Sequence, residues 1–313
     1  MFRINTLNKD GWEVVELADM GSGLRAEIIP SAGAILNGLF ISDDINILDG
    51  YSNKNDFIKR VHDGFRSAKL SPFVCRLNQS TYSWEGKPYI LDKFVLNGSA
   101  LHGIIYDASF DIMETIADNT LAAVVLRYQY DGQLSGYPFP FNCTITYRLS
   151  AEGNLKITTH ISNPAAAEQS LPICDGWHPY FKLGGKVDDW FLEICSDQMM
   201  EYSTELIPTG RYITNSTYYP GRLIGSDTLD NGFLLQEAKS PFCTLKNDKV
   251  KVEFIAQQHY PFLQLYIPES RDSIAIENLS AAPDAFNNGM GLMVLNPGDK
   301  IDFITDWRIT KIG

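Results

Sequence analysis

The chain has 313 residues, and its 44% of hydrophobic and 20% of charged residues are typical of a globular protein rather than a disordered one. Its formal net charge of −12 argues against a nucleic-acid partner, because phosphate contacts need clustered lysine and arginine side chains. No apolar run is long enough for a signal peptide or a membrane span, so we expect no membrane contact and a cytoplasmic location.

Alternation of apolar and polar residues with a period of two is the main local pattern, and turn residues interrupt it at short intervals. The one helical pattern comes early in the chain, at residues 55–61 with Asn55 as N-cap. Strands are predicted at 120–131, 142–164, 249–257, 262–270, 273–279 and 292–295. Segment 142–164 is predicted to be a hairpin that turns at residues 151–154. Other predicted turns are Asp10-Gly11, Glu85-Gly86, Asn97-Gly98, Asp131-Gly132, Asn231-Gly232 and Pro297-Gly298.

This pattern predicts an all-β protein, because strands with frequent turns dominate and no strand–helix alternation is present. At roughly 10–12 residues for each strand with its turn, the length implies well over twenty strands, arranged as a large antiparallel β-sandwich. No linker-like composition shift or short repeat divides the chain. We therefore expect residues 1–313 to form a single β-domain.

Two of the five histidines lie in segments that suggest a functional role. His178 lies between Trp177 and Pro179-Tyr180-Phe181, where it is either a half-buried core histidine or a proton donor beside aromatic rings. His102 precedes Gly103, and the glycine permits a sharp bend and a close approach by another group. For His102, a structural or solvent-exposed histidine is the simpler interpretation.

Four further polar residues are candidates for the same site. Glu277 interrupts an apolar strand pattern, where a carboxylate is costly unless it is paired, hydrogen-bonded or used in chemistry. Arg76 and Asn78 precede the strand pair that turns at Glu85-Gly86, and a surface salt bridge would also explain the arginine. Asp230 is followed by Asn231-Gly232, so an ordinary turn is its simpler explanation.

Taken in order, these segments resemble the aldose 1-epimerase family, also called the galactose mutarotases. The resemblance covers about residues 5–310 and depends on the order of its motifs, since each is weak alone. It departs from the family pattern at Cys75-Arg76-Leu77, where Asn-Arg-Ile is usual, and at Asn278, where many members have proline. The matching segments are Pro72-Phe73 to Asn78, 82–91, Leu101-His102-Gly103, His178 to Phe181, 206–210, Leu229-Asp230 with Phe233, Ile276-Glu277 and 282–299.

The resemblance implies a β-sandwich with many strands and an open sugar-binding cleft across one sheet. It also implies that Glu277 is the base on the C1 hydroxyl, His178 the acid on the ring oxygen and His102 an assisting donor. Arg76, Asn78, Asp230 and Tyr180 would bind the sugar. The substrate would be a free aldohexose of the galactose or glucose type, and the reaction would need no cofactor and no metal.

This assignment carries an expectation about protonation. The ordinary pKa values of histidine and glutamic acid are about 6.5 and 4.3. For Glu277 to be ionised while His178 is protonated near neutral pH, we expect a nearby carboxylate to raise the pKa of His178.

Three alternatives use the same residues. A carbohydrate-binding protein without catalysis would share the cleft and the aromatic side chains. A hexose-6-phosphate epimerase would need additional arginines, for which Arg66 and Arg76 are candidates. A metal enzyme with His102, His178 and Glu277 as ligands lacks any close ligand spacing, and the five scattered cysteines favour reduced thiols over a zinc site. The particular sugar and the oligomeric state stay open.

Overall fold

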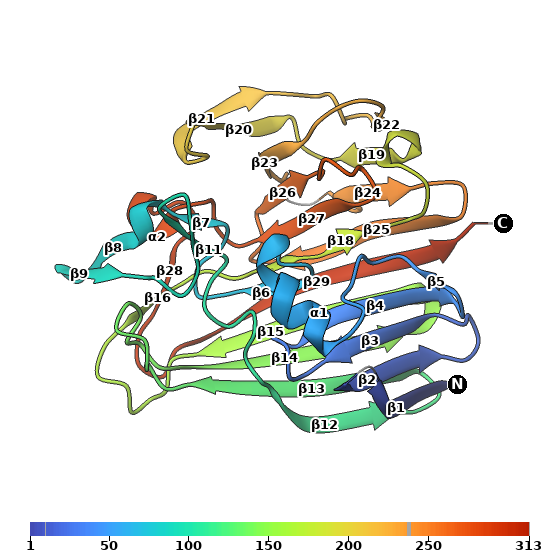
Figure 1. The fold of residues 1–313 in the computed structure, drawn as a ribbon, viewed down its shortest axis with the longest axis horizontal. Coiled ribbons are helices and arrows are strands. Elements are labelled where there is room, and N and C mark those ends of the chain that lie inside the picture. The colour runs from blue at the N-terminus through green and yellow to red at the C-terminus, as the bar shows by residue number, and fades with distance from the viewer. Residues whose placement is uncertain (10, 237–238, 313) are drawn as a thin grey trace.

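The computed structural model describes residues 1–313 except 10, 237, 238 and 313, and antiparallel strands make up most of it (Figure 1). This confirms the predicted all-β class. The two chain ends lie on the same side of the molecule, opposite the hairpin formed by β8 (Thr81–Trp84) and β9 (Lys87–Ile90). Among the described residues, no helix is both long and apolar enough to cross a membrane.

The largest sheet has nine strands, and its central hairpin shows why the sequence alternates. Residues of β14 and β15 are buried and partly exposed in turn, because one face of this sheet covers the core and the other faces solvent. In spatial order the strands are β12 (Asp111–Ala117), β13 (Leu121–Tyr130), β14 (Phe141–Ser150), β15 (Asn154–Ser162), β29 (Lys300–Lys311), β25 (Val250–Gln258), β24 (Cys243–Lys246), β19 (Phe191–Ile194) and β22 (Arg222–Leu223).

A second sheet of eight strands carries the candidate site residues. Every residue of its strand β27 is buried, so both faces of that strand are covered. In spatial order the strands are β21 (Pro208–Thr214), β20 (Gln198–Tyr202), β23 (Asp230–Leu234), β26 (Phe262–Tyr266), β27 (Ile274–Leu279), β17 (Gly176–His178) and β6 (Ala68–Leu70), with β18 (Tyr180–Phe181) also paired to β27.

The remaining elements form a third large sheet, which packs against β13 and β14 of the nine-stranded sheet, and several smaller sheets and helices. One sheet holds β1 (Phe2–Lys9), β2 (Trp12–Asp19), β3 (Arg25–Ile29), β4 (Ile35–Ser42) and β5 (Ile45–Asn46). Small sheets contain β10 (Val95–Leu96), β11 (Ser99–Leu101) and β7 (Arg76–Leu77), and β16 (Leu171–Ile173) with β28 (Met293–Leu295). The helices are α1 (Lys54–Arg60) and α2 (Ala285–Asn288), and single 3₁₀ turns cover Val61–Asp63, Asn78–Ser80, Ala151–Gly153 and Val187–Asp189.

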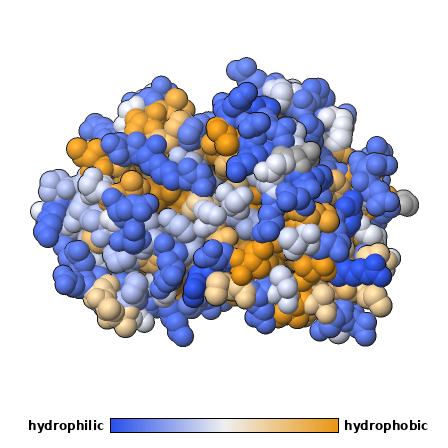
Figure 2. Space-filling model, turned by 60° about the horizontal axis from the view of Figure 1, so that its bottom comes forward, coloured by the Kyte–Doolittle hydropathy of each residue, from blue (hydrophilic) through white to orange (hydrophobic). Residues whose placement is uncertain are grey.

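The core lies between the nine-stranded and eight-stranded sheets, which pack face to face. Trp307 of β29 contacts Phe181 of β18 with ring centroids 5.3 Å apart, and Tyr147 of β14 contacts Trp177 of β17 at 5.9 Å. Burying each such side chain stabilises the fold by about 1.5–3 kcal/mol. The surface is mainly hydrophilic in the view shown, with hydrophobic residues gathered in separate patches (Figure 2).

The predicted helix is present, but its N-cap was placed two residues too late. Asn53 is extended at the start of α1, and its side-chain oxygen accepts a 2.9 Å hydrogen bond from the Asp56 N–H. Asn55 lies inside the helix instead. An asparagine cap satisfies one of the backbone donors that the first helical turn leaves free, and two asparagines close in sequence compete for that position.

The predicted hairpins are confirmed, and one predicted turn is wrong. Gly153 has φ +71° in the turn between β14 and β15, and Glu85-Gly86 joins β8 to β9 with φ values of +48° and +77°. Asn231-Gly232 instead lies inside strand β23. Asp10 of the Asp10-Gly11 turn lies outside the described residues.

Alanine substitutions at two glycines allow the cost of backbone strain to be distinguished from the cost of a steric clash. Gly86 and Gly153 both have φ near the left-handed region, but a Cβ at Gly153 would lie 2.1 Å from the Ile309 carbonyl oxygen, whereas a Cβ at Gly86 would meet nothing within 4 Å. We expect Gly86→Ala to lower the free energy of unfolding by about 1 kcal/mol and Gly153→Ala by roughly 3 kcal/mol. Urea unfolding measures both values. Equal losses would contradict the contact at Ile309.

Candidate active site

Strand register places His178 directly opposite Glu277. Gly176 pairs with Leu279 and Tyr180 pairs with Ala275, so the position midway between them on each strand faces its counterpart. Directly opposed residues on neighbouring strands project from the same face of a sheet. The two candidates, about a hundred positions apart in sequence, are therefore cross-strand neighbours.

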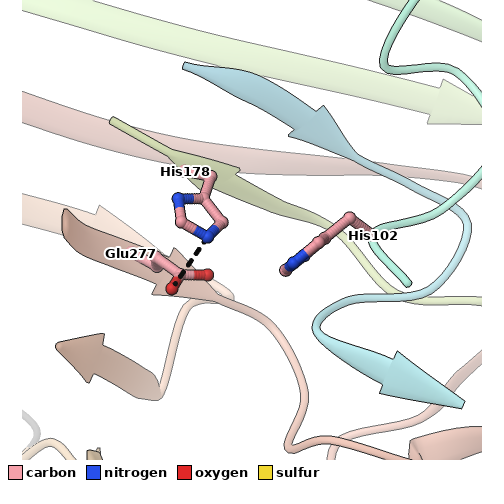
Figure 3. Close-up of side chains that lie close together, drawn as sticks. All are labelled: His102, His178 and Glu277. Carbon is pink, nitrogen blue, oxygen red and sulfur yellow. Dashed lines mark ion pairs between the residues drawn. The ribbon is translucent and has the colours of Figure 1, made fainter. Parts of the chain in front are cut away.

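The buried pair is in contact. His178 Nε2 lies 3.3 Å from Glu277 Oε1, and the two residues are only 5% and 2% exposed. The Tyr180 ring stacks on the His178 ring with centroids 5.1 Å apart and an angle of 13° between planes. This stacking fixes the imidazole plane, so that Nε2 points at the carboxylate (Figure 3).

His102 approaches the pair from a third segment, just after β11. Its ring lies 4.9 Å from the His178 ring, edge to face, and the three side chains point toward one another (Figure 3). Its backbone has φ +60°, held by a 2.9 Å hydrogen bond from its N–H to the Cys75 carbonyl. Gly103 follows with φ +77°, and a Cβ there would lie 2.2 Å from the Ser71 carbonyl oxygen. The glycine thus permits the close approach that turns His102 inward.

Burial shifts the protonation of all three side chains toward their neutral forms. Desolvation lowers the pKa of His178 to about 4 and raises the pKa of Glu277 well above its ordinary value. Burial, reinforced by His178 and Arg76, also lowers the pKa of His102 well below its usual range. The expected rise in the pKa of His178 is therefore wrong in direction, because burial removes hydration from the charged imidazole.

A hydrogen-bonded chain orients Asp230 beside this pair. Gln264 of β26 is opposite Glu277 in register, its Nε2 donates to Asp230 Oδ1 at 2.8 Å, and its Oε1 accepts from the Tyr202 hydroxyl at 3.0 Å. Asp230 is exposed to solvent at the start of β23, but partial desolvation of its carboxyl by the pocket wall raises its pKa. Gly232 is needed here because a Cβ on it would lie 2.2 Å from the Tyr202 hydroxyl oxygen. This explains why Asn231-Gly232 is a strand segment rather than a turn, and it replaces the turn interpretation of Asp230.

The remaining predicted residues separate into two groups. Arg76 and Tyr180 line the same pocket as the histidines and the two carboxylates. Asn78 does not line it; its backbone N–H donates to Asp284 Oδ1 at 2.9 Å, and the residue borders an adjoining hollow. Trp177 is 3% exposed and packs in the core, on the side of β17 away from His178.

The pocket that these residues line has a volume of about 300 Å³ and is open on one side. Sequence reasoning missed several of its lining residues: Gln264, Tyr202, Tyr266, His62 and Phe65. A signal existed for Gln264, which is a lone polar residue in an apolar strand, and for His62, because histidines are scarce in this chain. The pocket combines hydroxyl-binding groups, a histidine–glutamate pair and aromatic walls.

Metal binding by the three central residues is geometrically conceivable. One ligand atom from each of His102, His178 and Glu277 lies within 4.8 Å of the others. The fold brings the three residues together, so their wide separation in the sequence is no argument against a metal site. The direct contact of His178 Nε2 with Glu277 Oε1 needs no ion, but it leaves His178 Nδ1 and Glu277 Oε2 buried without a hydrogen-bond partner.

The fold and this pocket define a β-sandwich protein with a buried histidine–glutamate pair. A sequence model of the aldose 1-epimerase family matches residues 14–307. The chain belongs to the aldose 1-epimerase family. The match confirms the resemblance found in the sequence.

Individual relatives are distant. The uncharacterized protein YihR of Escherichia coli is 23% identical over 237 residues, which span 73% of this chain and 74% of that protein. An aldose 1-epimerase of Streptococcus thermophilus is 25% identical over 241 residues, which span 74% of this chain and 65% of that protein.

Solved structures agree with the fold over the whole chain. A galactose mutarotase-like protein from Clostridium acetobutylicum superposes with a TM-score of 0.85, covering 100% of this chain and 99% of that one at 18% identity. A galactose 1-epimerase from Lactobacillus acidophilus gives a TM-score of 0.81 with the same coverage and identity. At this identity the similarity supports the galactose mutarotase-like fold.

The protonation of His178 is directly measurable. We expect the imidazole of the unliganded protein to stay neutral from pH 7 down to about pH 5 and to titrate near pH 4, since burial disfavours its charged form. Ring ¹⁵N chemical shifts report this, with His178→Asn used to assign the signals. A midpoint between pH 6 and 7, or an imidazolium signal at pH 7, would show instead that the ion pair persists in the empty pocket.

Proposed function

We propose that the protein is an aldose 1-epimerase that interconverts the α and β anomers of a free aldohexose of the galactose or glucose type. The observation that supports this most strongly is the contact between His178 and Glu277 inside a pocket of about 300 Å³. Mutarotation needs one base at the C1 hydroxyl and one acid at the ring oxygen. Two groups 3.3 Å apart are spaced to reach both oxygens of one hemiacetal carbon.

The steps follow from the positions of the pair. Glu277 takes the proton of the C1 hydroxyl, the C1–O5 bond breaks, and His178 gives a proton to the ring oxygen. The open aldehyde rotates about C1–C2, and closure returns both protons in the reverse direction. His102 assists as a neutral donor near the ring oxygen, since burial keeps it uncharged. Asp230 accepts from a ring hydroxyl, Arg76 donates to another, and Tyr180 supports the imidazole.

The proposed mechanism can be compared with the burial of the pair by counting the protons on His178 and Glu277. With the sugar bound and before ring opening, the proposed mechanism requires an ionic pair of carboxylate and imidazolium, although burial favours the neutral pair in the empty pocket; after ring opening the pair is neutral. The two forms hold the same number of protons. Since burial favours neutral forms of both side chains, the site stabilises the form that accompanies the open-chain sugar.

The charge around the pocket favours a neutral sugar over a 6-phosphate. Arg76 lines the pocket, but Arg66 pairs with Asp49 at 3.3 Å and lines a separate groove elsewhere on the molecule. Asp230 and Glu277 add acidic groups to the same lining. A phosphate group would need more than one arginine facing it to offset these carboxylates.

Two substitutions test catalysis against mere binding. We expect Glu277→Gln and His178→Asn each to lower the epimerisation rate by about 10²–10⁴, because each removes one proton-transfer group. The matched controls are Glu269→Gln and His160→Asn, since Glu269 is exposed and His160 lies on β15 beside Asp302, both outside the pocket. Polarimetry of freshly dissolved α-glucose and α-galactose measures the rate, with NMR exchange as a second readout.

The same assay decides between the alternatives. A carbohydrate-binding protein without catalysis predicts that micromolar wild-type protein leaves the decay of optical rotation unchanged for every sugar. A 6-phosphate epimerase predicts higher rates with glucose 6-phosphate than with glucose. A metal enzyme predicts loss of activity after chelation and recovery with added metal, whereas the proposed mechanism predicts no change.

The pH dependence of the rate follows from the two shifted groups. The active pair holds one transferable proton; a second proton, taken up as pH falls through about 4, removes the base. Loss of the last proton, as pH rises through the elevated pKa of Glu277, removes the acid. We expect a bell-shaped profile of kcat/KM with its acid limb near pH 4, after subtraction of uncatalysed mutarotation. An acid limb near pH 6.5 would contradict a desolvated histidine.

A further inference from the structure

His62 lines the candidate active site as an exposed residue, yet three aromatic side chains hold its ring. The ring stacks on Phe94 with centroids 4.1 Å apart and an angle of 13° between planes. It meets Tyr106 edge to face at 5.6 Å and Phe65 at 5.5 Å. Its Nε2 lies 3.1 Å from the Tyr106 hydroxyl. An exposed side chain ordinarily has several rotamers, so these contacts fix the ring before a ligand binds.

The other ring nitrogen of His62 is available to a ligand. Among the described residues, none forms a hydrogen bond with His62 Nδ1. Burial lowers the pKa of His62, so the imidazole is neutral at pH 7. A neutral ring nitrogen donates to a hydroxyl group in one tautomer and accepts from it in the other. The free nitrogen therefore suits an uncharged hydroxyl group rather than an anion.

Strand order places His62 at one end of the row of site residues. In spatial order the row is Asp230 on β23, Gln264 on β26, Glu277 on β27 and His178 on β17, and β6 follows β17 at the edge of the sheet. The segment that carries His62 leads into β6. It is joined to β17 by a 2.9 Å hydrogen bond from the Ser67 N–H to the His178 carbonyl. His62 therefore lies beyond His178, on the side away from Asp230.

The order of these groups matches the order of atoms around a pyranose ring. In the proposed mechanism Glu277 lies at the C1 hydroxyl and His178 at the ring oxygen, so C5 and C6 come next on the histidine side. The aromatic side chains continue in that direction. The Phe65 ring lies 4.6 Å from the ring of His102, and the His62 ring lies 5.5 Å further on. The substituent at C5 therefore extends toward Phe65 and His62.

We propose that His62 binds the C6 hydroxyl of an aldohexose through Nδ1 and is a specificity-determining residue for sugars with a hydroxymethyl group at C5. The inference rests on the proposed epimerase function and extends it to a part of the sugar remote from the reacting atoms. Phe65 presents an apolar ring to the C–H groups of the same substituent. A sugar without the C6 hydroxyl leaves the fixed ring nitrogen without a partner, and a hydrogen bond is lost.

The test is a cycle that removes either the nitrogen or the hydroxyl. Glucose, 6-deoxyglucose and xylose share their configuration from C2 to C4 and differ only in the substituent at C5. His62→Phe keeps a ring to stack on Phe94 and removes the hydrogen-bonding atoms. In this variant we expect the ratio of kcat/KM for glucose to that for 6-deoxyglucose to fall about fivefold, the effect of one net hydrogen bond. The ratio for 6-deoxyglucose to xylose should stay the same. NMR exchange between anomers measures all three sugars, and comparing ratios cancels their different intrinsic reactivities.

Two further variants separate sugar contact from a structural role. His62→Phe leaves the Tyr106 hydroxyl without its partner, so the double variant His62→Phe/Tyr106→Phe removes both groups and should give the same fivefold change. The matched control is His259→Phe, an exposed histidine outside the pocket that also makes one hydrogen bond, to the Asp302 carbonyl. It should leave both ratios unchanged. Equal losses for all three sugars in the His62 variants would show a structural role or a contact with another hydroxyl, and would overturn the inference.

Failure of this inference is distinguishable from failure of the proposed function. If glucose is epimerised and the ratios do not change in His62→Phe, the role of His62 is wrong and the epimerase function stands. If no sugar is epimerised, the epimerase function is wrong, and calorimetric binding of glucose and 6-deoxyglucose decides the role of His62. Tighter binding of glucose that is lost in His62→Phe supports it. Equal affinity for the two sugars, or no binding of either, overturns it.

Discussion

The pairing of β27 with β17 and β18 is the constraint on which the site depends. Pro179 interrupts the partner strand between β17 and β18, yet its carbonyl still accepts a 3.2 Å hydrogen bond from the Ile276 N–H, so the register continues across the break. A shift of one residue would turn Glu277 to the opposite face of the sheet. The spacing of His178 and Glu277 is thus set by the backbone pairing of the strands that carry them.

On the core side of β17, buried polar side chains contact the nine-stranded sheet. Alternation along β17 points Trp177 away from His178, and the Lys69 ammonium lies 4.3 Å from the Trp177 ring centre. Lys69 also pairs with Asp175 and donates to Thr159 of β15 at 3.0 Å. Lys69 on β6 and Asp175 next to β17 both belong to the eight-stranded sheet, so the hydrogen bond to Thr159 is the contact here that reaches the nine-stranded sheet. Strand β17 therefore presents His178 to the pocket on one side and Trp177 to the core on the other.

The sequence could predict those features of the structure that depend on residues close together in the chain. Alternation located the strands and their hairpins, and a lone carboxylate in an apolar strand identified Glu277 because its burial needs a reason. The contacts of Gln264 with Tyr202 and Asp230 have no local signal, because they depend on which strands are neighbours. Gly232 was predicted as a turn for the same reason: only the neighbouring strand explains why a side chain is excluded there. The direction in which the pKa of His178 shifts also depends on burial, which no sequence pattern indicates.

His178 and Glu277 are in direct contact, and a sugar can bind between them only if this contact is broken. Burial of the pair gives a physical reason why breaking it is feasible. In water their ionic form would be strongly hydrated, whereas in this pocket each charge has lost most of its hydration. In the proposed mechanism, the C1 hydroxyl and ring oxygen of the sugar supply hydrogen bonds to the ionic form, and ring opening then converts it to the neutral form that burial favours. If the proposed mechanism holds, the desolvation that favours the neutral forms of both side chains lowers the energy of the opened state relative to the closed one. A more polar pocket would keep the ion pair intact and would raise the barrier to ring opening.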